Sequence, residues 1–85
     1  MSETYQLFKY DTCPFCLRVM RFLQSVPDLE VGLRDIYNEP GAMKELMQGG
    51  GRTTVPCLRI ESDEGVRWMY ESLDIISYLQ AQATA

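Results

Sequence analysis

The sequence predicts an α/β fold in which one mixed four-stranded sheet is flanked by three helices, in the order βαβαββα. Two observations indicate this fold. In the first half, strand-like and helix-like hydrophobic spacings alternate, which is typical of a βαβ unit with two parallel strands and a right-handed crossover. In the second half, two strand-like runs are separated by turn residues and followed by a helical pattern. The 85 residues are enough for one domain, residues 1–85.

The first predicted strand covers residues 4–10, because apolar side chains alternate there between two faces. The spacing then becomes helical. We expect Asp11 or Thr12 to be the N-cap of this helix, since both side chains can accept a hydrogen bond from a free backbone N–H. Pro14 falls in the first turn, where its missing N–H is harmless, and Pro27 ends the pattern.

The second predicted strand covers residues 29–36, where apolar residues alternate again. A short helix is expected to open at residues 39–40 and to end at the three glycines of residues 49–51. These glycines follow a helix and precede a strand. A phosphate-binding glycine loop has the opposite context, so we interpret them as a helix stop.

The last part of the chain is predicted to form a hairpin and a helix. The hairpin strands cover residues 55–61 and 66–70, and residues 62–65, Ser-Asp-Glu-Gly, form the turn. Ser72 is the expected cap of the final helix. The side chains expected on its inner face are Leu73, Ile76 and Leu79.

Composition excludes several classes of function. Eight basic and twelve acidic residues give a net charge of −4, without a basic stripe that could neutralise nucleic-acid phosphates. No stretch has the length and apolarity of a membrane span or of a secretion signal. We therefore expect a cytoplasmic monomer that binds neither nucleic acid nor membranes.

The stretch TCPFC at residues 12–16 carries the chemistry. Two cysteines at this spacing after a strand, in a βαβ context, are typical of a redox site. Cys13 at the start of a helix would meet free backbone N–H groups, and the amides of Phe15 and Cys16 could stabilise its thiolate. Cys16, one turn further on, should be buried and remain a thiol. Cys13 would attack a disulfide and Cys16 would resolve the mixed disulfide that results.

Other interpretations of the cysteines remain open. A zinc site would need a carboxylate ligand, because the chain has no histidine and only one further cysteine, Cys57. Haem attachment is excluded because position 17 is Leu17 and not histidine. Cys13 and Cys16 could also be purely structural. Cys57 is expected to fill the core below the middle helix, or else to be a half-exposed thiol.

Three motifs in sequence order resemble those of the glutaredoxins, which have a thioredoxin-like fold: TCPFC at 12–16, RTTVP at 52–56 and ESLDI at 71–75. The resemblance covers essentially the whole chain. It implies an oxidoreductase that uses glutathione as co-substrate and reduces protein disulfides and glutathione mixed disulfides, so that electrons pass from glutathione to disulfides. It implies no tightly bound cofactor and no metal.

The resemblance also implies a glutathione site. Pro56 matches a cis-proline that faces the cysteines, and the backbone of Val55 matches the partner of glutathione's cysteinyl unit. Ser72 and Asp74 match the polar helix start that holds the γ-glutamyl group, where free N–H groups favour a carboxylate. The predicted glutathione-binding residues are Phe15, Arg52, Thr54, Val55, Pro56, Glu71 and Ser72.

The sequence departs from the common glutaredoxin pattern in two places that bear on this site. Tyr10 stands where many glutaredoxins have a basic residue, and Lys9 precedes it on the opposite strand face. Met69-Tyr70-Glu71 replaces the glycine pair that usually precedes the last helix, and Glu71-Ser72 resembles the glutathione-binding pair in the N-terminal domain of glutathione transferases. Glu71 could receive the ammonium group of glutathione and Arg52 its glycyl carboxylate.

Alternatives remain for these residues and for the function. Glu71 could be a solvated acid that stabilises a helix dipole, and Arg52 could be an ordinary surface charge. We expect Trp68 and Tyr70 to be core or shielding residues. The alternative functions are a glutathione-transferase-like N-terminal domain and a module in which Cys13 and glutathione hold a [2Fe–2S] cluster.

Overall fold

The computed structural model describes residues 3–83 and contains the predicted βαβαββα order. The strands are β1 (Thr4–Lys9), β2 (Gly32–Asp35), β3 (Cys57–Ser62) and β4 (Gly65–Met69), and the helices are α1 (Pro14–Gln24), α2 (Ala42–Gly50) and α3 (Ser72–Ala83). The sheet order is β2-β1-β3-β4. β1 pairs parallel with β2, whereas β1 with β3 and β3 with β4 pair antiparallel, which confirms the predicted mixed sheet.

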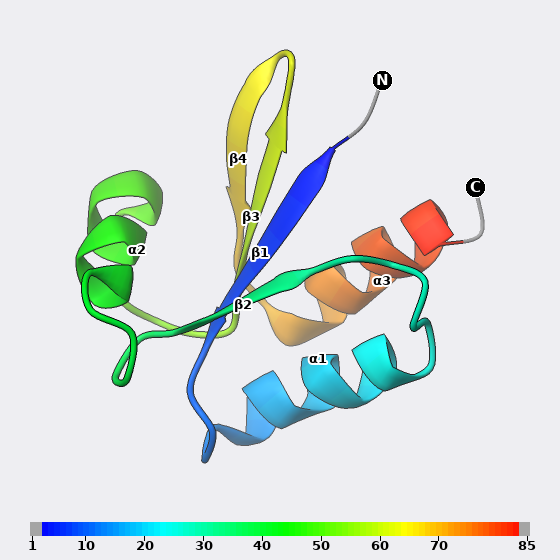
Figure 1. The fold of residues 1–85 in the computed structure, drawn as a ribbon, viewed down its shortest axis with the longest axis horizontal. Coiled ribbons are helices and arrows are strands. Elements are labelled where there is room, and N and C mark those ends of the chain that lie inside the picture. The colour runs from blue at the N-terminus through cyan, green and yellow to red at the C-terminus, as the bar shows by residue number, and fades with distance from the viewer. Residues whose placement is uncertain (1–2, 84–85) are drawn as a thin grey trace.

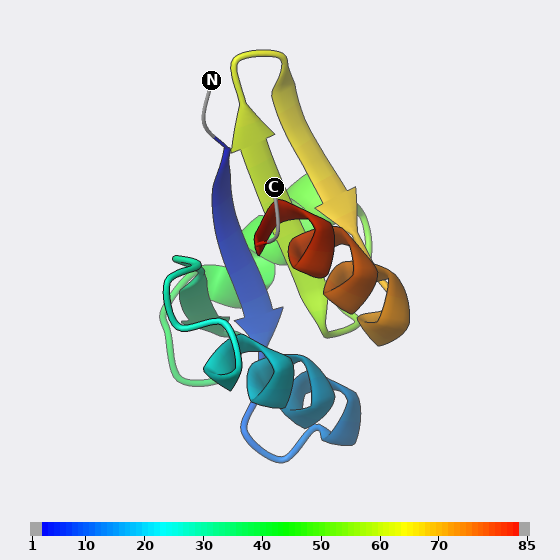
Figure 2. The ribbon, with the colours of Figure 1, turned by 90° about the vertical axis from the view of Figure 1, so that its right-hand side faces the viewer.

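The helices cover both faces of the sheet, with α1 and α3 on one face and α2 on the other (Figures 1 and 2). Alternation along β1 assigns Leu7 to the core below α1 and α3 and Phe8 to the core below α2. On β3, Leu58 joins the first of these cores, while Cys57 is fully buried in the second. Cys57 therefore fills the core below the middle helix, and it is not a half-exposed thiol.

The first helix begins later than the sequence predicted. Neither Asp11 nor Thr12 is its N-cap. Cys13 itself occupies that position, with extended backbone angles, and its Sγ accepts a hydrogen bond from the Cys16 N–H. Pro14 is the first helical residue, as predicted. Sulfur is not among the preferred capping groups, and for this reason a rule based on Ser, Thr, Asp and Asn selects the preceding residues instead.

Three further elements differ from the predictions by two residues or more at a boundary. β2 is shorter than residues 29–36, because its ladder with β1 joins only Gly32–Asp35 to the end of β1. α2 begins at Ala42 instead of residues 39–40, since Gly41 has a φ of +85° and cannot continue a right-handed helix. β3 begins at Cys57, two residues after the predicted start.

The final helix buries a different face from the one predicted. Its buried residues are Ser72, Ile75 and Leu79, whereas Leu73 is 64% exposed and Ile76 is partly buried at the edge of the core. The first turn of α3 directs Leu73 toward solvent, so only Leu79 of the predicted inner set is fully buried. This rotation places Leu73 beside the candidate site described below.

The glycines after α2 have two roles. Gly51, with a φ of +85°, is the C-cap, which confirms the predicted helix stop. Gly49 and Gly50 instead lie within the helix, directly against the rings of Trp68 and Tyr70 on the neighbouring hairpin. A Cβ at Gly49 would lie 2.6 Å from Trp68 Cε2 and closer still to Cζ2. These two positions therefore allow α2 to approach β4 closely.

Candidate functional site

Cys13 lies where strand β1 gives way to helix α1, and its sulfur is held at the helix terminus. The Cys13 Sγ accepts the Cys16 N–H at 3.2 Å and lies 3.9 Å from the carbonyl oxygen of Val55. Of the two amides that the sequence suggested as donors, only that of Cys16 makes this hydrogen bond among residues 3–83. The sulfur therefore lies at the positive end of the helix dipole and is bound by a backbone N–H of the first helical turn.

Cys16 differs from Cys13 in its surroundings. Its side chain is fully buried, and burial together with the hydrogen bond and negative charge of Cys13 raises the pKa of Cys16 to about 12. Burial also raises the pKa of Cys57 to about 11. Both thiols are therefore protonated at neutral pH, which makes them poor nucleophiles while the protein is folded.

We expect iodoacetamide at pH 7.5 to alkylate Cys13 well before the other two cysteines of the folded protein. Cys13 keeps 3% of its surface exposed, whereas Cys16 and Cys57 keep none, and their raised pKa values delay thiolate formation until about pH 11–12. Peptide mass spectrometry after short pulses measures the three rates. Unfolding in urea is the control, because it should make them similar. Equal rates for Cys57 and Cys13 before unfolding would contradict this prediction.

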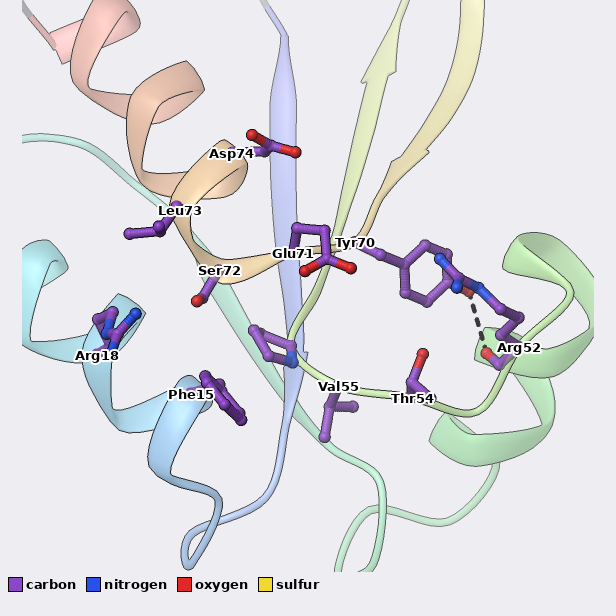
Figure 3. Close-up of a pocket in the computed structure, with 11 residues that line it drawn as sticks. Phe15, Arg18, Arg52, Thr54, Val55, Tyr70, Glu71, Ser72, Leu73 and Asp74 are labelled. Atoms are coloured by element: carbon purple, nitrogen blue, oxygen red, sulfur yellow. Dashed lines mark hydrogen bonds between the residues drawn. The ribbon is translucent and has the colours of Figure 1, made fainter.

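A cavity of about 460 Å³ opens between the start of α1, the segment before β3 and the start of α3 (Figure 3). Phe15, Thr54, Val55 and Pro56 line it. Arg52, Glu71 and Ser72 line it as well. All seven residues that the sequence predicted for glutathione thus lie around one cavity, although they come from three separate parts of the chain. Its volume suits a small ligand.

The segment before β3 forms the floor of this cavity. The Val55–Pro56 peptide bond is cis, as the resemblance implies. Pro56 is buried, whereas Val55 is only partly buried. The carbonyl oxygen of Val55 lies near Cys13 Sγ, the candidate nucleophile. The cavity therefore ends next to the candidate nucleophile.

Charged groups of both signs line the cavity. The Arg52 guanidinium stacks over the Tyr70 ring at 4.0 Å from its centroid, and the Tyr70 hydroxyl donates to the Arg52 carbonyl oxygen at 3.0 Å (Figure 3). Glu71 is the only non-glycine residue with a positive φ, +66°, among residues 3–83. Figure 3 shows its carboxylate and the Ser72 hydroxyl directed toward the cavity. The site can therefore receive carboxylates and an ammonium group at different places.

Four residues of the cavity are absent from the predicted set: Arg18, Tyr70, Leu73 and Asp74. The resemblance already suggested Asp74. Arg18 follows Phe15 by three residues, and its guanidinium lies 5.8 Å from the Phe15 ring, so helical spacing could have found it. Tyr70, which we predicted to be a core or shielding residue, is a wall of the cavity. No sequence signal separates these two roles for an aromatic residue at the end of a strand.

Lys9 does not line the cavity. Its side chain is 11% exposed and pairs with Asp11 at 2.8 Å and with Asp35 at 3.6 Å. The hydrogen bond that Lys9 donates to Asp11 and the charges of both carboxylates hold the pKa of Lys9 above its usual value. Alternation along β1 puts Lys9 on the opposite face from Tyr10, and neither residue lines the cavity.

No group of three or more His, Cys, Asp or Glu residues within residues 3–83 is placed to hold a metal ion. None of the helices in this part of the chain has the length and apolarity needed to cross a membrane.

Comparisons with known proteins agree with this geometry. The family model described as glutaredoxin matches residues 5–64. A wheat glutaredoxin structure is 20% identical, with a TM-score of 0.68, and the match covers 94% of this chain and 78% of the wheat chain. A thioredoxin-like protein is 17% identical, with a TM-score of 0.67, over 89% and 99% of the two chains. The fold is therefore thioredoxin-like, as predicted.

A larger enzyme also shares the fold. Maleylacetoacetate isomerase from Anaeromyxobacter dehalogenans 2CP-1, with glutathione bound in its active site, is 21% identical, with a TM-score of 0.72. The match covers 98% of this chain but spans only 39% of the isomerase chain. No curated protein sequence matches the chain.

Proposed function

The chain belongs to the glutaredoxin family, and from this we propose that it is a glutathione-dependent thiol–disulfide oxidoreductase that reduces glutathione mixed disulfides and protein disulfides. One observation carries the proposal: Cys13 Sγ accepts an amide N–H at a helix start and lies 3.9 Å from the carbonyl oxygen of Val55, which lines a cavity with both basic and acidic walls. The reaction consumes reduced glutathione, so we assign it to the cytoplasm.

Glutathione fits this cavity by charge. We assign its γ-glutamyl carboxylate to the start of α3, where Ser72 and free N–H groups favour an anion. Its ammonium group pairs with Glu71, and its glycyl carboxylate pairs with Arg52, which the Tyr70 ring already orients. The backbone of Val55 pairs with the cysteinyl unit in the manner of an added strand. This arrangement brings the glutathione sulfur to Cys13.

The reaction on a glutathione mixed disulfide needs Cys13 alone. The Cys13 thiolate attacks the glutathione sulfur, forms a Cys13–glutathione disulfide and releases the other thiolate, which takes a proton from water. A second glutathione, as its thiolate, attacks the glutathione sulfur of this disulfide. Oxidised glutathione leaves and Cys13 returns to the thiolate.

The reaction on a protein disulfide needs Cys16 as well. Cys13 attacks one sulfur of the substrate and forms a mixed disulfide with it. Cys16 then loses its proton, attacks Cys13 Sγ and releases the reduced substrate, leaving a Cys13–Cys16 disulfide that two molecules of glutathione reduce. The hydrogen bond and negative charge of Cys13 help to raise the pKa of Cys16. Both vanish once Cys13 is in a disulfide, so Cys16 becomes more acidic at the step that needs its thiolate.

We expect Cys16→Ser to keep deglutathionylation within about threefold of wild type and to lose reduction of protein disulfides by about 10²-fold or more, since only the second reaction uses Cys16 as nucleophile. Initial rates on a glutathionylated peptide and on insulin disulfides, both at saturating glutathione, measure these two activities. Comparable losses on the two substrates would show that Cys16 has another role.

A second candidate function is transfer of glutathione to an electrophile. The likeness to the isomerase with bound glutathione and the Glu71-Ser72 pair favour it. In that reaction the glutathione thiolate attacks carbon, and Cys13 need not form a disulfide. Conjugation of 1-chloro-2,4-dinitrobenzene that survives Cys13→Ser would favour this candidate over the oxidoreductase.

A further inference from the structure

Two tyrosines form a ring pair outside the glutathione cavity, and one of them, Tyr10, lies next to Cys13. Tyr10 begins the turn that leads to Cys13, whose N–H donates to the Tyr10 carbonyl oxygen at 3.3 Å. Tyr37 follows β2, and its ring centroid lies 5.1 Å from that of Tyr10. β1 and β2 are parallel, so both strands end at the same edge of the sheet, where α1 begins (Figure 1). Neither ring is among the cavity walls.

The position of Tyr37 is fixed although its side chain is 66% exposed, more than any other large hydrophobic residue in the described part of the chain. The Asp35 carboxylate accepts the backbone N–H groups of Tyr37 at 2.9 Å and Asn38 at 3.0 Å. The Glu39 N–H donates to the Asp35 carbonyl oxygen at 2.9 Å. An exposed aromatic ring in a rigid loop loses little conformational entropy when a partner packs against it.

Each tyrosine has an acidic residue close to it in the chain, since Asp11 follows Tyr10 and the Asp35 carboxylate accepts the Tyr37 N–H. Lys9 is shared between the carboxylates of Asp11 and Asp35, which leaves this group of three with one net negative charge, and the Asp11 side chain is 71% exposed. The nearby Cys13 raises the pKa of Tyr10 through its negative charge, which places that ring within electrostatic reach of the nucleophile. The faces of aromatic rings are themselves electronegative, so rings and carboxylate together favour a cation.

We propose that Tyr10 and Tyr37 bind a lysine or arginine side chain next to the reactive cysteine of a polypeptide substrate, and so select basic substrates. The inference rests on the proposed oxidoreductase function. The cavity holds glutathione on one side of Cys13. The polypeptide half of a mixed disulfide would then lie on the other side, over Tyr10 and Tyr37. The net charge of −4 on the whole protein also attracts basic substrates at longer range.

The test uses two glutathionylated peptides that differ only in carrying Lys or Glu beside the cysteine. Wild type should prefer the Lys peptide in kcat/KM by about three- to tenfold at low salt. Tyr37→Leu keeps an apolar side chain but removes the ring, so the preference should fall to about one. Tyr37→Phe keeps the ring and should keep the preference. Leu33→Ala, an exposed change on neighbouring β2, is the matched control with wild-type preference.

The outcomes separate this proposal from the proposed function. No preference in wild type, or a preference that survives in Tyr37→Leu, would refute the cation site while leaving the oxidoreductase intact. If wild type does not turn over any glutathione mixed disulfide, the proposed function fails first. NMR titration with peptides that carry serine in place of cysteine then decides the cation site alone. Shifts of the Tyr37 ring with the Lys peptide, and not with the Glu peptide, would support it.

Discussion

Replacing Cys13 by serine should reduce glutathione-dependent turnover of mixed disulfides by about 10³-fold or more, the loss expected when a nucleophile is removed. A serine hydroxyl keeps the N-cap hydrogen bond from the Cys16 N–H but does not ionise near neutral pH and cannot form a disulfide. The fold should therefore persist while the chemistry stops. Initial rates on a glutathionylated peptide, with circular dichroism of the variant, measure both effects.

The matched control for this experiment is Cys57→Ala. Cys57 is fully buried below α2 and has no part in the proposed reaction, so the variant should remain active and lose only stability from a small cavity. If Cys13→Ser keeps more than a tenth of wild-type activity, Cys13 is not the nucleophile. Cys16 and the proposed order of attack would then need to be reassigned.

Gly49→Ala should destabilise the protein by about 2 kcal/mol, which would lower the melting temperature by roughly 10 °C for a domain of this size. A Cβ at Gly49 would overlap Trp68, whose ring packs against Phe8 at a centroid separation of 5.5 Å and cannot move freely. The higher helix propensity of alanine offsets only about 1 kcal/mol of this cost. Thermal and urea unfolding measure the change.

Gly32→Ala is the matched control, because a Cβ there would meet no atom closer than 3.7 Å. This variant should unfold within about 0.5 kcal/mol of wild type, as surface substitutions usually do. A melting temperature for Gly49→Ala equal to that of Gly32→Ala would show that α2 can move away from the hairpin without a loss of stability.

Hydrophobic periodicity was sufficient to predict the order of elements and the pairing of strands. Alternation placed Leu7 and Phe8 in opposite cores, and the turn residues after β3 located the hairpin. The errors occur where local geometry overrides pattern. Gly41 takes a left-handed conformation that delays α2, and the first turn of α3 exposes Leu73 despite its apolar character. Such choices depend on backbone angles that periodicity does not report.

The candidate site was predicted mainly through motifs. All seven residues that the family resemblance suggested for glutathione line one cavity, because the motif at residues 52–56 and the start of α3 meet there. Tyr70 and Tyr37 were not predicted to lie at or beside the site. Both are aromatic residues at strand ends, and whether such a ring faces the core, a cavity or solvent depends on the packing of elements distant in sequence.

The left-handed conformation of Glu71 has a consequence for how this protein could be evolved. A glutamate at a φ of +66° costs about 1 kcal/mol relative to glycine, which adopts such angles freely. A library selected only for resistance to heat or proteolysis should therefore enrich glycine at position 71. A library selected for growth that depends on the enzyme should retain the acid, so the two selections would diverge at this one codon.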